Sequence, residues 1–289
     1  MFVSQNNLAG LKRYFTDRLA HLYSESELRQ IVKLFVVSRL VISDVEYMLG
    51  DVKFSESDLL FFRDAVKRLE KNEPLQHVLG TVIFCDLELK SDARALIPRP
   101  ETEELVYWIS EEHGQQKSLR MVDLCAGSGC IALALKSLFS EATVVAVELS
   151  EEALELIRTN QELTGLDIQR VKMDVLSDDW SNLANTDLFV SNPPYIPFKD
   201  QEEMHGNVLE YEPHMALFVE NDDPLLFYRE IGEKAFDHLT DEGWLYVEIH
   251  EKLGDDVIHL MKTIGFVNIE LRKDLQGKDR MVRGQKVLS

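Results

Sequence analysis

Hydrophobic residues recur at helical spacing up to about residue 73, with serine rather than glycine or proline at the breaks. Ser24 and Glu27 precede one hydrophobic run, and Ser55 and Asp58 precede another. This spacing is typical of a capping box, in which the two side chains satisfy backbone N–H groups at a helix start. We predict four or five short helices in a bundle. Pro74 should end the last of them, because its ring disfavours helix in the residue before it.

The hydrophobic period changes near residue 80. Residues 81–89 are rich in β-branched and aromatic side chains, which predicts a β-hairpin. Beyond it, five short apolar runs alternate with helical patterns, at residues 121–125, 143–148, 170–174, 187–191 and 245–249. This alternation is typical of a parallel sheet covered by helices on both faces. We therefore predict a doubly wound α/β fold, with a helical bundle over residues 1–73, a linker and hairpin over 74–100 and the main domain over 101–289.

Composition and charge narrow the class of protein. The 289 residues are 45% hydrophobic, as in ordinary globular proteins, and no stretch approaches the ~20 apolar residues that cross a bilayer. We therefore expect a cytoplasmic protein that does not contact membranes. Three cysteines and scattered histidines provide neither a disulfide framework nor the spacing of zinc ligands, so no metal is expected. The net charge of −20 repels polyanions, which argues against direct nucleic-acid binding.

A glycine-rich turn follows the first predicted strand of the main domain. Asp123 lies within that strand, and the small residues between Cys125 and Gly129 allow a ligand to approach the backbone closely. Glu148 ends the next strand, where a carboxylate can accept hydrogen bonds from both hydroxyls of a ribose. These features indicate an adenosine-containing cofactor. The glycine spacing fits a dinucleotide as well as a methyl donor, so both remain open on this motif.

The tetrapeptide Asn192-Pro193-Pro194-Tyr195 follows the fourth predicted strand and is the most specific motif in the chain. The two prolines fix the backbone and donate no hydrogen bond, which leaves the Asn192 side-chain oxygen and the neighbouring carbonyl as rigid acceptors. Two acceptors that hold both hydrogens of an amide NH2 group would draw its lone pair back to nitrogen and aim it at an electrophilic methyl. Tyr195 would supply an aromatic wall for the flat acceptor group.

With these motifs the chain resembles the PrmC/HemK family of methyltransferases. The resemblance covers roughly residues 74–283, and it is carried by Asn192-Pro193-Pro194-Tyr195, the block from Ile97 to Glu104, the loop from Gly127 to Ala132, and Tyr211-Glu212-Pro213. It implies a Rossmann-like class I methyltransferase domain with a seven-stranded, mostly parallel sheet, preceded by a small all-helical domain and a linking β-hairpin. Family members use S-adenosylmethionine to methylate the side-chain N5 of the glutamine in the Gly-Gly-Gln motif of peptide chain release factors.

The resemblance also assigns expected roles to residues. Those expected to bind the cofactor, whose product is S-adenosylhomocysteine, are Asp123, Cys125, Ala126, Gly127, Ser128, Gly129, Glu148, Asp174, Val175 and Asn192. Those expected to receive the glutamine are Asn192, Pro193, Pro194 and Tyr195, with Asn192, Pro193 and Tyr195 catalytic. The helical region is expected to dock the release factor, and the protein is expected to be a monomer. Cys125-Ala126 and Glu148 depart from the Gly-Thr and Asp that the family often has there.

Other functions remain as alternatives. A nucleic-acid adenine N6 methyltransferase uses the same tetrapeptide on the exocyclic NH2 group of a flipped base, but the strong negative charge disfavours it. A dinucleotide-dependent dehydrogenase is supported by the glycine loop alone. A binding module without catalysis would keep the fold but lack methyl transfer. His250, at the end of the last predicted strand, lies near the expected reaction zone, and we favour a structural role for it.

Overall fold

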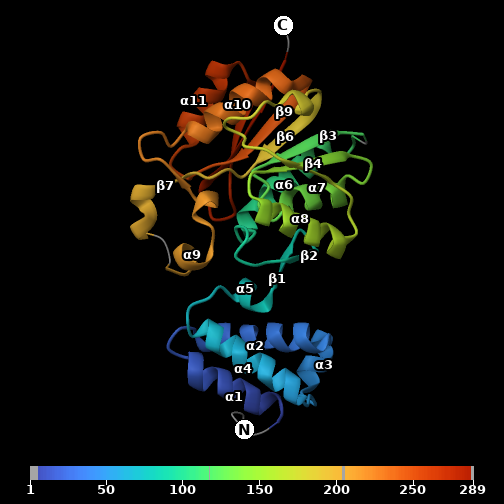
Figure 1. Cartoon of the computed structure of the whole chain (residues 1–289), viewed down its shortest axis with the longest axis vertical. Coiled ribbons are helices and arrows are strands. Elements are labelled where there is room, and N and C mark those ends of the chain that lie inside the picture. The colour runs from blue at the N-terminus through green and yellow to red at the C-terminus, as the bar shows by residue number, and fades with distance from the viewer. Residues whose placement is uncertain (1–5, 117, 204–205, 288–289) are drawn as a thin grey trace. The chain divides into compact units, whose positions relative to one another are not determined.

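The computed structural model describes residues 6–116, 118–203 and 206–287 (Figure 1). The chain divides into two compact units. We call Met1–Gly80 with Gly206–Tyr211 the helical unit, and Thr81–His205 with Glu212–Ser289 the sheet unit. Across the described ranges, no helix has both the length and the apolar character needed to span a membrane.

The helical unit packs amphipathic helices around a small aromatic core. It contains α1 (Leu8–Leu19), α2 (Glu25–Leu40), α3 (Asp44–Leu49), α4 (Glu56–Leu69), α5 (Leu75–Leu79) and α9 (Gly206–Tyr211). Phe15, Phe35 and Phe62 are fully buried in it. The predicted capping box at the start of α2 is confirmed, because Ser24 N–H donates to Glu27 at 2.7 Å and Glu27 N–H donates to the Ser24 hydroxyl at 3.3 Å. A second capping box, from Ser55, starts α4 as predicted.

Pro74 does not end the last helix of this unit, so that prediction is wrong. Helix α4 already ends at Leu69, and the chain turns at Asn72, whose φ of 58° is left-handed. Pro74 instead precedes α5, with a φ of −55°. Proline suits a helix start, since its fixed φ is close to helical and the first N–H groups of a helix have no intrahelical partner.

A β-hairpin begins the sheet unit, as predicted for this stretch. Strands β1 (Thr81–Phe84) and β2 (Leu87–Lys90) pair antiparallel, with Phe84 opposite Leu87. Cys85 and Asp86 form the two-residue turn with φ of 45° and 63°, and two positive φ values are the geometry of a type I′ hairpin turn. The Cys85 N–H donates to Glu103 at 3.0 Å, which anchors the turn to the first helix of the sheet unit.

The central sheet has seven strands in the order β10-β11-β9-β6-β3-β4-β5. Its strands are β3 (Arg120–Leu124), β4 (Thr143–Glu148), β5 (Gln169–Lys172), β6 (Thr186–Ser191), β9 (Leu239–Glu248), β10 (Val267–Lys273) and β11 (Asp279–Gln285). The first five correspond to the apolar runs in the sequence and are mutually parallel. Strands β10 and β11 add an antiparallel edge.

Helices cover both faces of this sheet (Figure 1). They are α6 (Pro100–His113), α7 (Cys130–Leu138), α8 (Glu151–Thr164), α10 (Leu226–His238) and α11 (Gly254–Ile264). Leu105, Leu133 and Ile157, from α6, α7 and α8, belong to one hydrophobic core. Ile231 and Val257, from α10 and α11, belong to a second. The sheet therefore lies between two apolar layers, which is the doubly wound arrangement predicted.

Short elements complete the loops before and after β6. Strands β7 (Ile196–Pro197) and β8 (Phe218–Val219) pair in parallel, and the 3₁₀ helices are η1 (Ser181–Leu183), η2 (Phe198–Glu203) and η3 (His214–Ala216). The strand order reverses at β3, since β4 and β5 extend to one side of it and β6 lies on the other. Open α/β sheets bind ligands outside the carboxyl ends of the strands at such a point.

Candidate active site

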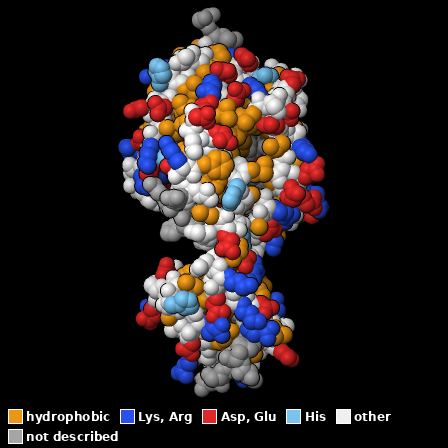
Figure 2. All heavy atoms as spheres, turned by 60° about the vertical axis from the view of Figure 1, so that its left-hand side comes forward, with side chains coloured by type: hydrophobic (Ala, Val, Ile, Leu, Met, Phe, Trp, Pro, Cys, Tyr) orange, Lys and Arg blue, Asp and Glu red, His pale blue; other side chains and the backbone are white. Residues whose placement is uncertain are grey.

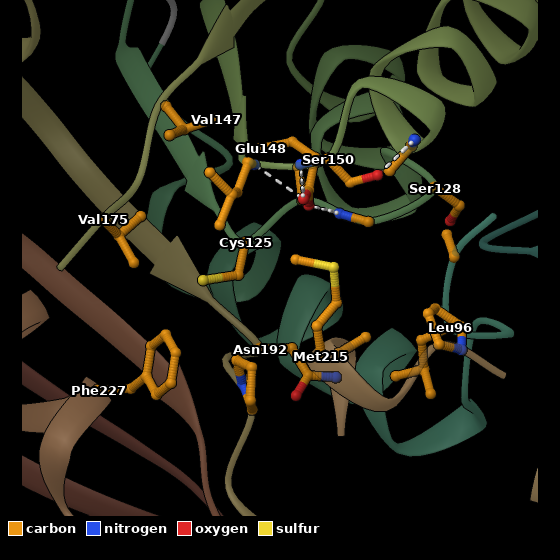
Figure 3. Close-up of a pocket in the computed structure, with 18 of the residues that line it drawn as sticks. Leu96, Cys125, Ser128, Val147, Glu148, Ser150, Val175, Asn192, Met215 and Phe227 are labelled. Atoms are coloured by element: carbon orange, nitrogen blue, oxygen red, sulfur yellow. Dashed lines mark hydrogen bonds between the residues drawn. The ribbon is translucent and has the colours of Figure 1, made fainter. Parts of the chain in front are cut away.

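A pocket of about 420 Å³ opens at the carboxyl ends of β3, β4, β5 and β6 (Figure 3). The sequence-predicted residues that line it are Cys125, Ala126, Gly127, Ser128, Glu148, Asp174, Val175, Asn192 and Pro194. Asp123, Gly129, Pro193 and Tyr195 are not among the described lining residues. The pocket thus brings together side chains from four strand ends, and all of its lining belongs to the sheet unit.

The loop after β3 is tightly turned. Cys125, Gly127 and Gly129 have φ of 60°, 54° and 78°. A Cβ on Gly129 would lie 3.0 Å from the Ile157 side chain of α8, so only glycine permits both this backbone and this close packing. Asn160, also on α8, donates to the Ser128 carbonyl at 3.0 Å and fixes the loop from behind. Sequence reasoning missed Asn160, which occupies an ordinary mid-helix position.

Glu148 joins the end of β4 to this loop. One carboxylate oxygen accepts the Gly127 N–H at 2.8 Å, and the other accepts the N–H groups of Leu149 and Ser150 at 2.8 and 2.9 Å (Figure 3). A carboxylate has about four acceptor positions, so three backbone donors leave about one for a ligand hydroxyl. The expected contact of Glu148 with a ribose stays a prediction.

Two polar oxygen atoms under the loop have no protein partner among the described residues. They are Asp123 Oδ1 and Ser128 Oγ. The other carboxylate oxygen of Asp123 accepts the Ala132 N–H at the start of α7, at 3.1 Å. Burial raises the pKa of the Asp123 carboxyl well above its usual range. A buried polar atom without a partner is costly, and Ser128 lines the pocket, so its hydroxyl fits a bound group with polar atoms, such as the amino-acid end of S-adenosylmethionine.

Asn192 lies immediately after β6 and faces the pocket (Figure 3). The preceding Ser191 hydroxyl donates to the Leu124 carbonyl at 2.8 Å, which ties the end of β6 to the end of β3. Asn192 Nδ2 donates to the Thr102 hydroxyl at 3.2 Å. In Figure 3 the Met215 side chain projects into the space between Asn192 and Glu148. The acceptor motif and the glycine loop therefore share one cavity.

Glu248 connects Asn192, through Thr102, with Tyr195 at the other end of the tetrapeptide. This carboxylate, at the end of β9, is only 2% exposed. It accepts the Thr102 hydroxyl at 2.6 Å and the Tyr195 hydroxyl at 3.1 Å. Burial raises the pKa of Glu248. Thr102 and Glu248 were not predicted as site residues, although Thr102 lies in the family-matching block and Glu248 ends a strand, as Glu148 does.

Tyr195 is placed differently from its expected position as an aromatic wall. Its ring packs edge-on against His250, with centroids 6.1 Å apart, and burial raises the pKa of its phenol. His250 Nδ1 accepts the Lys252 N–H at 3.1 Å, and burial lowers the pKa of this imidazole. These contacts are those of a supporting layer behind the pocket.

Glu212 fixes the segment that precedes α6. Its carboxylate, 1% exposed, accepts the Ile97 N–H at 2.9 Å and the Arg99 guanidinium at 2.7 Å. Leu96, Pro98 and Arg99 line the pocket beside it. Because the Glu212 carboxylate is buried, these two bonds satisfy its charge and fix this wall of the pocket.

Known proteins share this architecture and sequence. Residues 102–211 match the family described as "Methyltransferase small domain". The release factor glutamine methyltransferase of Flavobacterium psychrophilum is 38% identical over 93% of this chain and 95% of its own length. That of Bacteroides thetaiotaomicron is 36% identical over 93% of this chain and 96% of its own. This chain belongs to the release factor glutamine methyltransferase family.

Membership of this family confirms the resemblance seen in the sequence. The Thermus thermophilus 16S rRNA N2 G1207 methyltransferase RsmC, solved in complex with AdoMet and guanosine, has a TM-score of 0.51 and 19% identity, over 71% of this chain and 49% of that one. This likeness supports the fold, and the predicted Rossmann-like methyltransferase architecture is confirmed. Among the described residues of this family member, no group of three His, Cys, Asp or Glu side chains could hold a metal ion.

Proposed function

We propose that this protein transfers the methyl group of S-adenosylmethionine to the side-chain N5 of the glutamine in the Gly-Gly-Gln motif of peptide chain release factors. Relatives at 36–38% identity over 93% of the chain support the reaction. The observation that carries the proposal in this chain is the position of Asn192. Its amide nitrogen is engaged by Thr102, so its oxygen is the atom left to accept a hydrogen bond in the pocket.

The cofactor supplies an electrophilic methyl carbon bonded to a sulfonium. In the transfer, the lone pair of the glutamine nitrogen forms a bond to this carbon while the carbon–sulfur bond breaks, and the electron pair stays on sulfur in S-adenosylhomocysteine. The nitrogen then releases one proton to water and becomes a neutral secondary amide. The balance needs no metal and no covalent intermediate with the protein, so positioning is the main task of the chain.

Several lining residues would hold the cofactor. The loop from Cys125 to Gly129 would contact its methionine part, Glu148 its ribose, and Asp174 with Val175 its adenine. The Asp174 carboxylate accepts the Leu176 N–H at 2.9 Å, which stabilises the backbone turn after β5. The Ser128 hydroxyl, which lines the pocket and has no hydrogen-bond partner among the described residues, supports a polar group at that end of the pocket.

Asn192, Pro193, Pro194 and Tyr195 would receive the glutamine. The Asn192 oxygen and the following carbonyl would accept the two hydrogens of the amide, which favours a carboxamide over a carboxylate. A glutamate would present oxygens to these acceptors and leave them unpaired, at a cost of about 1–3 kcal/mol for each lost hydrogen bond. In this proposal Pro193 and Tyr195 act as parts of a rigid support for Asn192.

The protein substrate defines the partner and the setting. We infer that the helical region over residues 1–73 docks the release factor, that residues 101–289 carry the transfer, and that the protein works as a monomer. We also infer that it makes no direct contact with nucleic acid or membrane, and that it acts in the cytoplasm, where translation factors are found.

A label-transfer experiment tests the proposal. The protein is incubated with S-adenosylmethionine labelled in its methyl group and with a release factor, single-stranded DNA or RNA in separate reactions. We expect label on the release factor alone, mapped to the Gly-Gly-Gln glutamine, and no transfer to a release factor in which this glutamine is alanine. Label on adenine, or on a different residue of the release factor, would overturn the substrate assignment.

A further inference from the structure

Three side chains from distant parts of the sequence form one hydrogen-bonded chain behind the acceptor site. Glu248 ends β9, Thr102 lies in the first turn of α6, and Asn192 follows β6. The Thr102 hydroxyl donates to Glu248 at 2.6 Å, and Asn192 Nδ2 donates to the Thr102 oxygen at 3.2 Å. Thr102 and Glu248 are each 2% exposed, so water does not compete for these bonds.

The chemistry of these groups sets the direction of the chain. An ionised carboxylate can only accept hydrogen bonds, and a hydroxyl has a single proton to donate. Because the Thr102 proton goes to Glu248, the Thr102 oxygen can only accept from Asn192. The two ends of an amide have nearly the same shape, so the hydrogen-bond network decides which end faces which partner. Here the nitrogen of Asn192 must face Thr102, which turns its oxygen away from Thr102.

We propose that Glu248 is a positioning and specificity-determining residue, which fixes the amide of Asn192 with its oxygen toward the substrate. Glu248 lies outside the pocket lining and touches neither substrate nor cofactor, so it acts through Thr102. This inference rests on the proposed function, in which Asn192 must accept a hydrogen bond from an amide NH2 group. If Asn192 rotated by half a turn, it would present a donor and favour a carboxylate substrate instead.

The same carboxylate also supports the other end of the tetrapeptide. Its second oxygen accepts the Tyr195 hydroxyl at 3.1 Å. Arg280 on β11 lies close enough to favour the charged form of Glu248, and it is itself paired with Asp274 at 3.0 Å. The buried Glu248 carboxylate therefore binds Tyr195 directly and fixes Asn192 through Thr102. The two prolines between Asn192 and Tyr195 have fixed φ angles, so the tetrapeptide is held rigidly at both ends.

Substitutions can separate this role from simple packing. Glu248→Gln keeps the shape but replaces one of the two acceptor oxygens with an NH2 group, so one of the two hydroxyls would face a donor. Thr102→Val removes the hydroxyl at nearly constant volume, whereas Thr102→Ser retains it. Glu251→Gln is the matched control, because Glu251 lies near the same strand end and pairs with Lys278 at the surface. All variants are made in the full-length chain and assayed with an intact release factor.

The first measurement is the split between kcat and binding. For Glu248→Gln and Thr102→Val we expect kcat to fall about 10- to 100-fold, while the Kd for S-adenosylhomocysteine changes less than about threefold. Thr102→Ser should recover most of the rate lost in Thr102→Val, and Glu251→Gln should retain the wild-type kcat. If both Glu248→Gln and Thr102→Val keep kcat within about threefold of the wild type, the proposal is wrong.

The second measurement is selectivity, which a merely structural role would not change. The Kd of a release factor with Gly-Gly-Glu is compared with that of the natural Gly-Gly-Gln form, by calorimetry with S-adenosylhomocysteine present. The wild type should prefer glutamine, and this preference should shrink about tenfold in Thr102→Val, in which the amide of Asn192 can rotate. An unchanged preference would overturn the inference. Failure of the wild type to methylate any release factor would instead reject the proposed function, so the two failures are distinguishable.

Discussion

The two units of the molecule differ in how charge is distributed. Residues 1–80 contain 11 basic and 11 acidic side chains, whereas residues 81–289 contain 20 basic and 40 acidic ones. The net charge of −20 therefore belongs entirely to the second region. Figure 2 shows blue and red side chains interspersed over the helical unit, as expected for a neutral surface. The sheet unit repels polyanions, while the helical unit is free to contact partners of either charge.

The units also differ in the range of their key contacts. The helix caps of the helical unit join residues three positions apart, as between Ser24 and Glu27. In the sheet unit, Glu212 contacts a backbone group 115 positions away, and Glu248 contacts Thr102 at a separation of 146. Local signals thus mark where these helices start, whereas the site depends on pairs that only the complete fold brings together. This contrast implies that the units respond independently to substitution.

The largest effect is expected from Phe62→Ala in α4. Phe62 is fully buried and packs against Phe54 with ring centroids 5.2 Å apart. Its truncation should lower the free energy of unfolding by about 3–5 kcal/mol, measured by urea denaturation followed by circular dichroism. Leu60→Ala, at a 40% exposed position of the same helix, is the control with little effect. If Phe62→Ala also lost S-adenosylhomocysteine binding, the two units would be coupled, and their independent response to substitution would be refuted.

Asn192→Ala should affect chemistry and leave the helical unit unchanged. Removal of one preorganised hydrogen-bonding group from an active site typically costs about 100- to 1000-fold in kcat, or about 2.7–4 kcal/mol. We expect a loss of this size in methyl transfer, with cofactor affinity and urea denaturation like those of the wild type. Asn182→Ala, at an exposed position of the 3₁₀ helix η1 in the same unit, serves as the control. Retention of kcat in Asn192→Ala would remove Asn192 from the mechanism.

The pH dependence of the rate should report on Glu248. The titratable groups that face it are Glu101 on α6, Tyr195 after β6, Tyr228 on α10 and Arg280 on β11. Burial raises the pKa of Glu248, and only its ionised form accepts both hydroxyls, so kcat should fall as pH falls through that pKa. The fall should begin above the usual glutamate value of about 4.3 and approach tenfold per pH unit.

Two variants test which residue causes this fall in kcat at low pH, the acid limb of the pH profile. Glu248→Gln should abolish the fall in kcat at low pH. His250 is the other group that could cause this fall, because burial lowers the pKa of its imidazole. If Glu248 is the cause, His250→Asn should leave the fall in place. The helical unit should be insensitive over the same range. Hydrogen bonds from Ser24 lower the pKa of Glu27, so the contribution of this cap is present above the unfolded value of about 4.3 and is lost only as pH falls further. Persistence of the limb in Glu248→Gln would exclude Glu248 as its source.

The smallest effect is expected from Ser24→Ala. It removes the N-cap hydroxyl of α2 and should lower the free energy of unfolding of the helical unit by about 1 kcal/mol. The measurement is again urea denaturation, with the exposed Ser26→Ala as a control within the same helix. The kcat for methyl transfer should not change. A clear fall in kcat would show that α2 participates in the reaction.

Much of the fold follows from local sequence, and its failures have local causes. Four of the five parallel strands are mostly buried and appear as apolar runs, while β5 is a mostly exposed edge strand. Strand β10 also has a mostly exposed pattern, with Glu270, Arg272 and Lys273, and gave no such signal. Pro74 was misassigned because proline suits a helix start as well as a position after a helix. In each case, the pattern was compatible with two structures and tertiary context chose between them.

The site was predictable only where its residues follow strands. Asn192 and Glu148 end buried runs, and their presence in one pocket follows from the topology of a parallel sheet. Asn160 gave no such signal, because it occupies an ordinary mid-helix position. Glu248 does end a strand, but its role depends on Thr102, a partner 146 positions away. Tyr195 was recognised by its motif, but the direction of its side chain is set by the buried carboxylate beneath it.

The hydroxyl of Ser191 that closes the gap between β6 and β3 has one further consequence. Adjacent strands lie about 4.8 Å apart, a separation imposed by the backbone hydrogen bonds of every sheet. Leu124 and Ser191 are register partners on these strands, so the glycine-rich loop after β3 and the tetrapeptide after β6 begin one strand spacing apart. The distance between the starts of these two segments is thereby set by the backbone hydrogen bonds of the sheet.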